Sequence, residues 1–123
     1  MKKILLIEDE TNIRSLYAEV LREGGYEVVE ISEGMHGLEV AKKDSWDLLL
    51  LDIMLPSLDG VEILRRIKAD ANLSSRPIII VSNLESEDIK TTCAELGAKE
   101  FLVKANIMPK DILLAVKRHV FDK

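Results

Sequence analysis

The sequence predicts an α/β protein with a doubly wound, five-stranded parallel sheet, and three observations support this fold class. Five short apolar runs recur along the chain, and most of them do not alternate polar with apolar residues. Unbroken runs of this kind suit strands that are covered on both faces. Stretches with helical periodicity separate the runs. The length of 123 residues suits one domain, which we expect to span residues 1–123.

The predicted strands are the apolar runs at residues 4–7, 28–31, 48–51, 78–81 and 101–103. Glu30 interrupts the second run, whereas the third consists of four leucines. Right-handed crossovers would place the intervening helices on both faces of the sheet. We therefore expect the flavodoxin-like strand order 2-1-3-4-5. In such sheets ligands bind at the carboxyl ends of the strands, near the order reversal between strands 1 and 3.

The predicted helices follow from apolar stripes and from signals at their ends. The first helix has a stripe at helical spacing, formed by Ile13, Leu16, Tyr17, Val20 and Leu21. Shorter stripes mark three further helices, around residues 38–41, 61–67 and 89–96. Gly24 and Gly25 end the first helix, and Gly97 ends the fourth. Pro109 opens the fifth helix in its first turn.

Composition and charge exclude several classes of protein. The net charge is −5 and the basic residues are dispersed, so we expect no direct binding to nucleic acid or to an anionic membrane. The longest apolar run, at 112–116, has five residues and is too short to span a bilayer. The first apolar run meets Glu8 and Asp9 directly, unlike a signal peptide. We therefore expect a cytoplasmic protein.

Polar side chains follow four of the predicted strands. Glu8 and Asp9 follow the first strand, and Asp52 follows the third. Ser82 follows the fourth and Lys104 the fifth. Since the carboxyl ends of parallel strands share one edge of a sheet, we expect these side chains to converge. Three carboxylates so close repel one another and call for a cation. The ligands on offer are oxygen atoms, which indicates a hard ion, most simply Mg²⁺.

The remaining two groups suggest what the site binds. The Lys104 ammonium can neutralise an acid, or hold an anion between itself and the metal, and the Ser82 hydroxyl can donate a hydrogen bond to that anion. A metal, an ammonium and a hydroxyl around a carboxylate would form a receptor for a phosphoryl group in transfer. Asp52 would then be the nucleophile and would form an acyl phosphate.

At these positions the chain resembles the receiver domain of two-component response regulators, over essentially its whole length. The acidic pair of the family matches Glu8 and Asp9, and its phosphoacceptor matches Asp52. Its Ser/Thr matches Ser82 and its lysine matches Lys104. The resemblance implies Mg²⁺-dependent transfer of a phosphoryl group from the phosphohistidine of a histidine kinase. The chain would catalyse its own phosphorylation and dephosphorylation, and would otherwise not be an enzyme.

The resemblance also implies how the signal moves. Met54 would supply a backbone carbonyl to the metal. Ser82 would move toward the phosphoryl group, and Phe101 would be the switch aromatic that turns into the space left; a plain core role for Phe101 is the alternative. The face made by the fourth helix, fifth strand and fifth helix would bind a downstream protein. A histidine kinase or histidine phosphotransfer protein would be the upstream partner of this single-domain switch.

Two residues depart from the family pattern. The family usually follows its lysine with a proline in a cis peptide, but here Ala105 follows Lys104. A cis bond to a non-proline residue costs about 2.5–4 kcal/mol. We therefore expect either a trans bond with a rearranged loop or a cis bond held by its neighbours. Asn83 stands where a small residue is common, and we expect it to point outward.

Three other functions compete with the phosphoacceptor switch. The first is a receiver-fold binding module that works without phosphorylation. The second is a phosphatase or phosphotransferase of the haloacid dehalogenase type, which would need a second acid where Met54 stands. The third is a flavodoxin-like flavin carrier, whose phosphate the acidic loop at 9–12 would repel.

Overall fold

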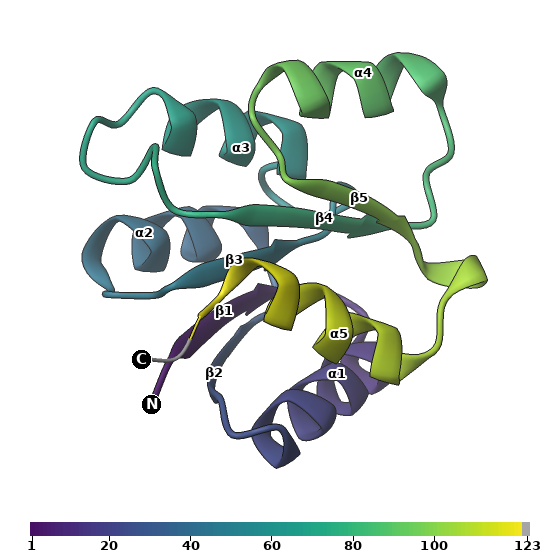
Figure 1. Cartoon of the computed structure of the whole chain (residues 1–123). Coiled ribbons are helices and arrows are strands. Elements are labelled where there is room, and N and C mark those ends of the chain that lie inside the picture. The colour runs from purple at the N-terminus through teal and green to yellow at the C-terminus, as the bar shows by residue number, and fades with distance from the viewer. Residues whose placement is uncertain (122–123) are drawn as a thin grey trace.

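The computed structural model describes residues 1–121 as three layers, with a parallel sheet between two layers of helices (Figure 1). Its strands are β1 (Lys3–Ile7), β2 (Glu27–Ile31), β3 (Leu48–Leu51), β4 (Ile78–Ser82) and β5 (Glu100–Val103). All neighbouring strands pair in parallel, and the order is β2-β1-β3-β4-β5. The predicted fold class and strand order are therefore confirmed.

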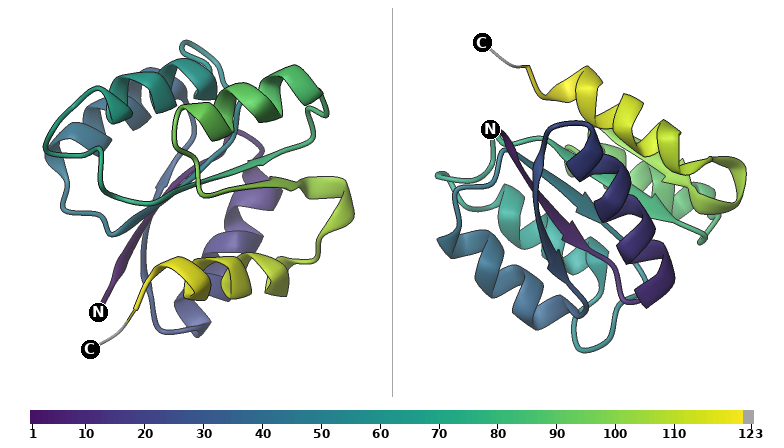
Figure 2. Two further views of the ribbon diagram at one scale, coloured as in Figure 1. Left: turned by 45° about the horizontal axis from the view of Figure 1, so that its top comes forward. Right: turned by 90° about the horizontal axis from the view of Figure 1, so that it is seen from below.

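The helices cover both faces of the sheet, as the two views in Figure 2 show. They are α1 (Thr11–Glu23), α2 (Gly34–Lys43), α3 (Gly60–Lys68), α4 (Glu87–Glu95) and α5 (Pro109–His119). A short 3₁₀ helix, η1 (Lys104–Asn106), lies between β5 and α5. Helices α1 and α5 pack on one face, and α2, α3 and α4 pack on the other.

The four leucines of β3 explain why this run does not alternate. Leu49 and Leu51 belong to the core beneath α2, α3 and α4, whereas Leu48 and Leu50 belong to the core beneath α1 and α5. All four side chains are completely buried. A central strand between two helix layers needs apolar side chains on both of its faces.

Glu30 interrupts the apolar run of β2 because β2 is an edge strand. The Glu30 carboxylate pairs with Arg22 Nη1 at 3.0 Å and with Arg14 Nε at 3.6 Å. Arg22 Nη2 also donates to the Val28 carbonyl at 3.0 Å. Charged side chains of this kind shield an edge strand from pairing with another chain.

The element ends follow the predicted signals, and four of the five strands differ from the prediction by one residue. Gly25 and Gly97 adopt positive φ angles of 96° and 102° after α1 and α4, as glycine does at helix ends. Strands β1, β2 and β5 each start one residue earlier than predicted, and β4 includes Ser82. The pairs Lys3↔Glu27, Ile79↔Glu100 and Ser82↔Val103 extend the ladders by these residues. None of the helices described is both long and apolar enough to cross a membrane.

Candidate functional site

The carboxylates of Glu8, Asp9 and Asp52 converge at the carboxyl edge of the sheet. One oxygen atom from each lies within 4.8 Å of the other two. Backbone hydrogen bonds that continue the strand pairing position two of them. Glu8 N donates to the Ile31 carbonyl at 3.0 Å, and Asp52 N donates to the Ile7 carbonyl at 3.1 Å. The pairing of β1 with both β2 and β3 therefore brings Glu8 and Asp52 together, and Asp9 follows Glu8 directly.

Lys104 extends from the end of β5 to the same acids. Its Nζ lies 2.8 Å from Asp52 Oδ2, and it also pairs with the Glu8 carboxylate. Burial acts to lower the pKa of Lys104, but the hydrogen bonds to Asp52 and Glu8 raise it above the usual range. Burial raises the pKa of Glu8 although Lys104 opposes that shift. In this arrangement Lys104 is the internal counter-ion of two acids.

The loop after β3 fixes the Asp52 side chain. Asp52 Oδ1 accepts a hydrogen bond from Ile53 N at 2.7 Å. Gly60 N donates to the Ile53 carbonyl at 2.8 Å and closes the loop. A Cβ atom at Gly60 would lie 2.1 Å from the Asp52 carbonyl oxygen, so the close approach requires glycine. The glycine and the backbone hydrogen bonds of this loop therefore hold Asp52 in position.

These groups open into a pocket of about 320 Å³ at the edge of the sheet. The pocket is lined by Glu8, Asp9, Glu10, Ile13, Asp52, Met54, Ser82, Asn83 and Lys104. When all are ionised, the three converging carboxylates exceed the one ammonium by two negative charges. No histidine or cysteine lines the pocket. A donor set of oxygen atoms with this charge fits a hard divalent cation.

Ser82 is the last residue of β4 and lines the pocket, and Phe101 lies in β5. The Ser82 hydroxyl is buried and accepts a hydrogen bond from Leu84 N at 3.2 Å. Phe101 is partly buried and packs against the core beneath α2, α3 and α4. Lys90 Nζ of α4 lies 5.8 Å from the centre of the Phe101 ring. Phe101 therefore joins β5 to α4.

The loop after Lys104 resolves the alternatives for its peptide bond. No peptide bond in the described residues is cis, so the Lys104–Ala105 bond is trans and the chain forms η1. Asn83 is exposed at the rim of the pocket, and its Oδ1 accepts a hydrogen bond from Ala105 N at 2.9 Å. The sequence did not predict this contact, although a residue other than proline at position 105 leaves an N–H available.

Sequence reasoning also missed Arg14. Its Nη1 donates to the Glu8 carbonyl oxygen at 2.8 Å, while its Nε faces Glu30 of β2. Arg14 therefore holds the backbone of the first acid from the first turn of α1. The signal was a single basic residue six positions after Glu8, which is too common a spacing to identify such a role.

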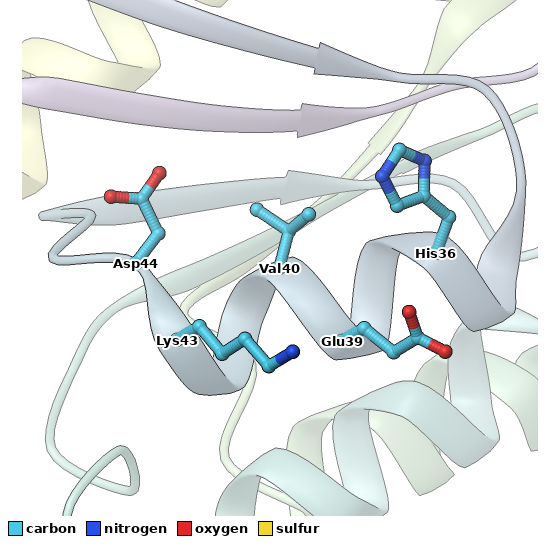
Figure 3. Close-up of a pocket in the computed structure, with 5 residues that line it drawn as sticks. All are labelled: His36, Glu39, Val40, Lys43 and Asp44. Carbon is cyan, nitrogen blue, oxygen red and sulfur yellow. The ribbon is translucent and has the colours of Figure 1, made fainter.

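A second concavity, of about 360 Å³, lies along α2 (Figure 3). It is lined by His36, Glu39, Val40, Lys43 and Asp44. In Figure 3 the side chains of His36, Val40 and Asp44 follow one side of the helix. Asp44 is already paired with Lys3 at 2.7 Å. Across the described residues, only Glu8, Asp9 and Asp52 form a group of three or more potential metal ligands.

The sequence matches the family model of the response regulator receiver domain over residues 4–117. The chain therefore belongs to this family of phosphoryl-accepting switches in two-component systems. This agrees with its strand order and with the acidic site at the carboxyl edge of its sheet.

Two curated relatives illustrate the range of matches. The alkaline phosphatase synthesis transcriptional regulatory protein PhoP of Bacillus subtilis is 34% identical over 116 residues, which cover 94% of this chain and 47% of that protein. The sporulation initiation phosphotransferase F of the same organism is 36% identical over 104 residues, which cover 84% of this chain and 82% of that protein. The chain spans about half the length of the curated transcriptional regulators it matches.

Solved structures agree with the fold. A CheY-like receiver domain protein from Methanospirillum hungatei superposes with a TM-score of 0.89 at 27% identity, covering 96% of this chain and 92% of that one. The Mn²⁺-bound form of response regulator Rcp1 superposes with a TM-score of 0.83 at 28% identity, covering 96% of this chain and 91% of that one.

Proposed function

We propose that Asp52 accepts a phosphoryl group from the phosphohistidine of a histidine kinase or histidine phosphotransfer protein, with Mg²⁺ held beside it. The observation that carries the proposal is the convergence of Glu8, Asp9 and Asp52 with Lys104 in one open pocket. The similarity to the sporulation phosphotransferase supports a place in a phosphorelay. We expect the switch to operate in the cytoplasm.

The carboxylates of Glu8, Asp9 and Asp52 and the backbone carbonyl of Met54 would hold the metal. The Mn²⁺-bound Rcp1 structure supports a divalent cation in this fold. Mg²⁺ is the simplest choice because it prefers oxygen ligands and retains several waters. When bound, it would supply positive charge that offsets the carboxylates and the oxygens of the incoming phosphoryl group.

In the transfer step, a carboxylate oxygen of Asp52 forms a bond to phosphorus while the bond from phosphorus to the imidazole nitrogen breaks. The electron pair stays on that nitrogen, and the product is an acyl phosphate. Lys104 already contacts Asp52 Oδ2, so a small shift would bring its ammonium to a phosphoryl oxygen. The Ser82 hydroxyl would exchange its bond with Leu84 N for a bond that it donates to the phosphoryl group. Attack by water would later restore the carboxylate and release phosphate.

Phosphorylation would stabilise a conformation that the free protein populates only sparsely. Because Phe101 joins β5 to α4, a change in its position would alter the face formed by α4, β5 and α5. We propose that a downstream protein recognises this face. Its partner would be a protein rather than nucleic acid, because the chain carries a net charge of −5.

The test is incubation of the protein with acetyl phosphate or phosphoramidate and Mg²⁺, followed by intact mass measurement. One phosphoryl group should add to the wild type, and none should add to Asp52→Asn. Asp59→Asn is the matched control from the same loop, because asparagine retains the helix-capping role of Asp59 at α3. This control should gain the phosphoryl group as the wild type does.

The competing function is a receiver-fold binding module that works without phosphorylation. Its outcome in the same experiment is measurable Mg²⁺ binding with no adduct on the wild type. Lys104→Ala sharpens the distinction, because the proposed contact is with phosphoryl oxygens. This variant should lose more phosphorylation than Mg²⁺ affinity, and equal losses would count against the role given to Lys104.

A further inference from the structure

We propose that Asn83 is a positioning residue for phosphoryl transfer. Its side chain ties the loop after β4 to the loop after β5, and so fixes Ser82 and Lys104 relative to each other. This inference rests on the proposed function, since it assigns a role in phosphorylation of the same pocket. The contact that carries it is the hydrogen bond from Ala105 N to Asn83 Oδ1, 2.9 Å long.

The bond lies directly beyond the end of the ladder between β4 and β5. The last register pair of these strands is Ser82↔Val103. Asn83 is the first residue after β4, and its side chain accepts a hydrogen bond from the backbone two positions after Val103. The pairing of the two strands therefore continues by one step through a side chain. Without it, each loop would leave the sheet independently.

The donor exists because the chain has alanine after Lys104. Proline would have no N–H to donate. The Ala105 N–H lies in the first turn of η1, where helix geometry provides no internal acceptor. Asn83 supplies that acceptor from a different loop, across 22 positions of sequence. The trans Lys104–Ala105 bond and the Asn83 side chain thus form one local arrangement.

The two residues that this bond restrains would both contact the phosphoryl group. Ser82 immediately precedes Asn83, Lys104 immediately precedes Ala105, and Ser82, Asn83 and Lys104 line the pocket around Asp52. Transfer depends on the positions of such groups when the reaction occurs. The free energy of one ordinary hydrogen bond, if lost from the transition state, corresponds to a change of about two- to tenfold in the rate of phosphorylation.

The experiment compares Asn83→Ala with Asn106→Ala. Asn106 is an exposed asparagine in η1, and no hydrogen bond of its side chain is seen in the described residues. Three quantities are measured: the exchange rate of the Ala105 amide proton by NMR, the rate of phosphorylation by acetyl phosphate, and the Mg²⁺ affinity by calorimetry. Asn83→Asp, which retains an acceptor oxygen, serves as the rescue variant for amide exchange.

We expect Asn83→Ala to exchange the Ala105 amide faster and to be phosphorylated about two- to tenfold more slowly, with unchanged Mg²⁺ affinity. Asn106→Ala should match the wild type in all three quantities, and Asn83→Asp should keep the amide protected. If the wild type is phosphorylated and Asn83→Ala is phosphorylated at an equal or faster rate, the role of Asn83 is overturned and the proposed function stands. A wild type that is not phosphorylated would overturn the proposed function and this role with it.

Discussion

The sheet has an amino edge, where its strands begin, and a carboxyl edge, where they end, and the two edges differ in how their charged groups are paired. At the amino edge, polar groups are paired with one another. Trp46 is almost fully buried, its Nε1 donates to the Ala41 carbonyl at 2.9 Å, and the Arg76 guanidinium lies 4.9 Å from its ring centre. Arg76 Nη1 donates to the Asp44 carbonyl at 3.1 Å, and Lys3 pairs with the Asp44 carboxylate at 2.7 Å. Each of these cations has an oxygen partner within this network.

At the carboxyl edge, charge remains in excess. Glu8 and Asp52 share the single ammonium of Lys104, and Asp9 lies exposed beside them. The two edges belong to the same strands, so the difference comes from the residues that follow and precede them. The paired groups at the amino edge contribute to stability, whereas the carboxyl edge keeps an excess of negative charge that a bound cation can neutralise.

The largest effect we predict is at the amino edge. Trp46→Ala should lower the free energy of unfolding by about 3–5 kcal/mol, because it removes a buried aromatic side chain and the ring beneath Arg76. Urea unfolding followed by circular dichroism measures this. Trp46→Phe should lose less and remain folded, and its phosphorylation should match that of the wild type. A loss below about 1 kcal/mol for Trp46→Ala would contradict the stabilising role.

A smaller loss of stability is expected at the loop that carries Asp52. Gly60→Ala would place a Cβ 2.1 Å from the Asp52 carbonyl oxygen and 2.7 Å from Ile53 Cα. The loop must shift, at a cost of about 1–3 kcal/mol. Unlike Trp46→Phe, this variant should also be phosphorylated more slowly. Measuring unfolding and phosphorylation for both variants would distinguish an effect on stability alone from an effect on the site. A normal phosphorylation rate in Gly60→Ala would show that the loop does not position Asp52.

Cation binding should stabilise the protein through the carboxyl edge. At Mg²⁺ concentrations ten times the dissociation constant, linkage predicts a gain of about 1.4 kcal/mol in unfolding free energy. Asp9→Asn should remove most of this gain, since Asp9 is one of the three converging acids. Trp46→Phe should keep it. Thermal unfolding with and without Mg²⁺ provides the measurement, and an equal gain in Asp9→Asn would place the cation elsewhere.

The smallest effect concerns an ion pair on β5 and α5. The hydrogen bonds from Arg118, and then the contact with His119, lower the pKa of Glu100. Stability from a lowered carboxyl pKa is present above the unfolded value of about 4.3 and is lost as pH falls through the folded pKa. Arg118→Ala should therefore cost about 0.2–1 kcal/mol near neutral pH and less in acid.

Urea unfolding over a pH series checks this prediction. Lys117→Ala is the control, because Lys117 is an exposed cation in the same turn of α5. Its effect should be near zero and independent of pH. A cost of Arg118→Ala that stays constant into acid would show that the Glu100 pair does not stabilise the fold.

The sequence was sufficient to predict the fold because burial on two faces requires continuous apolar runs. The leucines of β3 are the clearest case, since alternate side chains enter different cores. The convergence of Glu8, Asp52 and Lys104 was also predictable, because it depends only on which edge the strands share. The position of Glu30 on an edge strand agrees with its interruption of the second run.

What the sequence could not predict depends on side-chain geometry. The reach of Lys104 to both Glu8 and Asp52 depends on rotamers and on the length of the glutamate. The bond of the Ser82 hydroxyl with Leu84 N depends on the turn after β4. The contact between Asn83 and Ala105 joins loops 22 positions apart, and no local pattern encodes it.

The most direct test of the central claim is an NMR titration of backbone amides with Mg²⁺. The claim is that the excess of negative charge at the carboxyl edge forms the cation site. Mg²⁺ should shift the amide signals of residues 8–10 and 52–54 and leave those of residues 45–47 unchanged. Addition of beryllofluoride should then shift the signals of Ser82 and Lys104. Mg²⁺ shifts that are largest along α2 or at the amino edge would contradict the account.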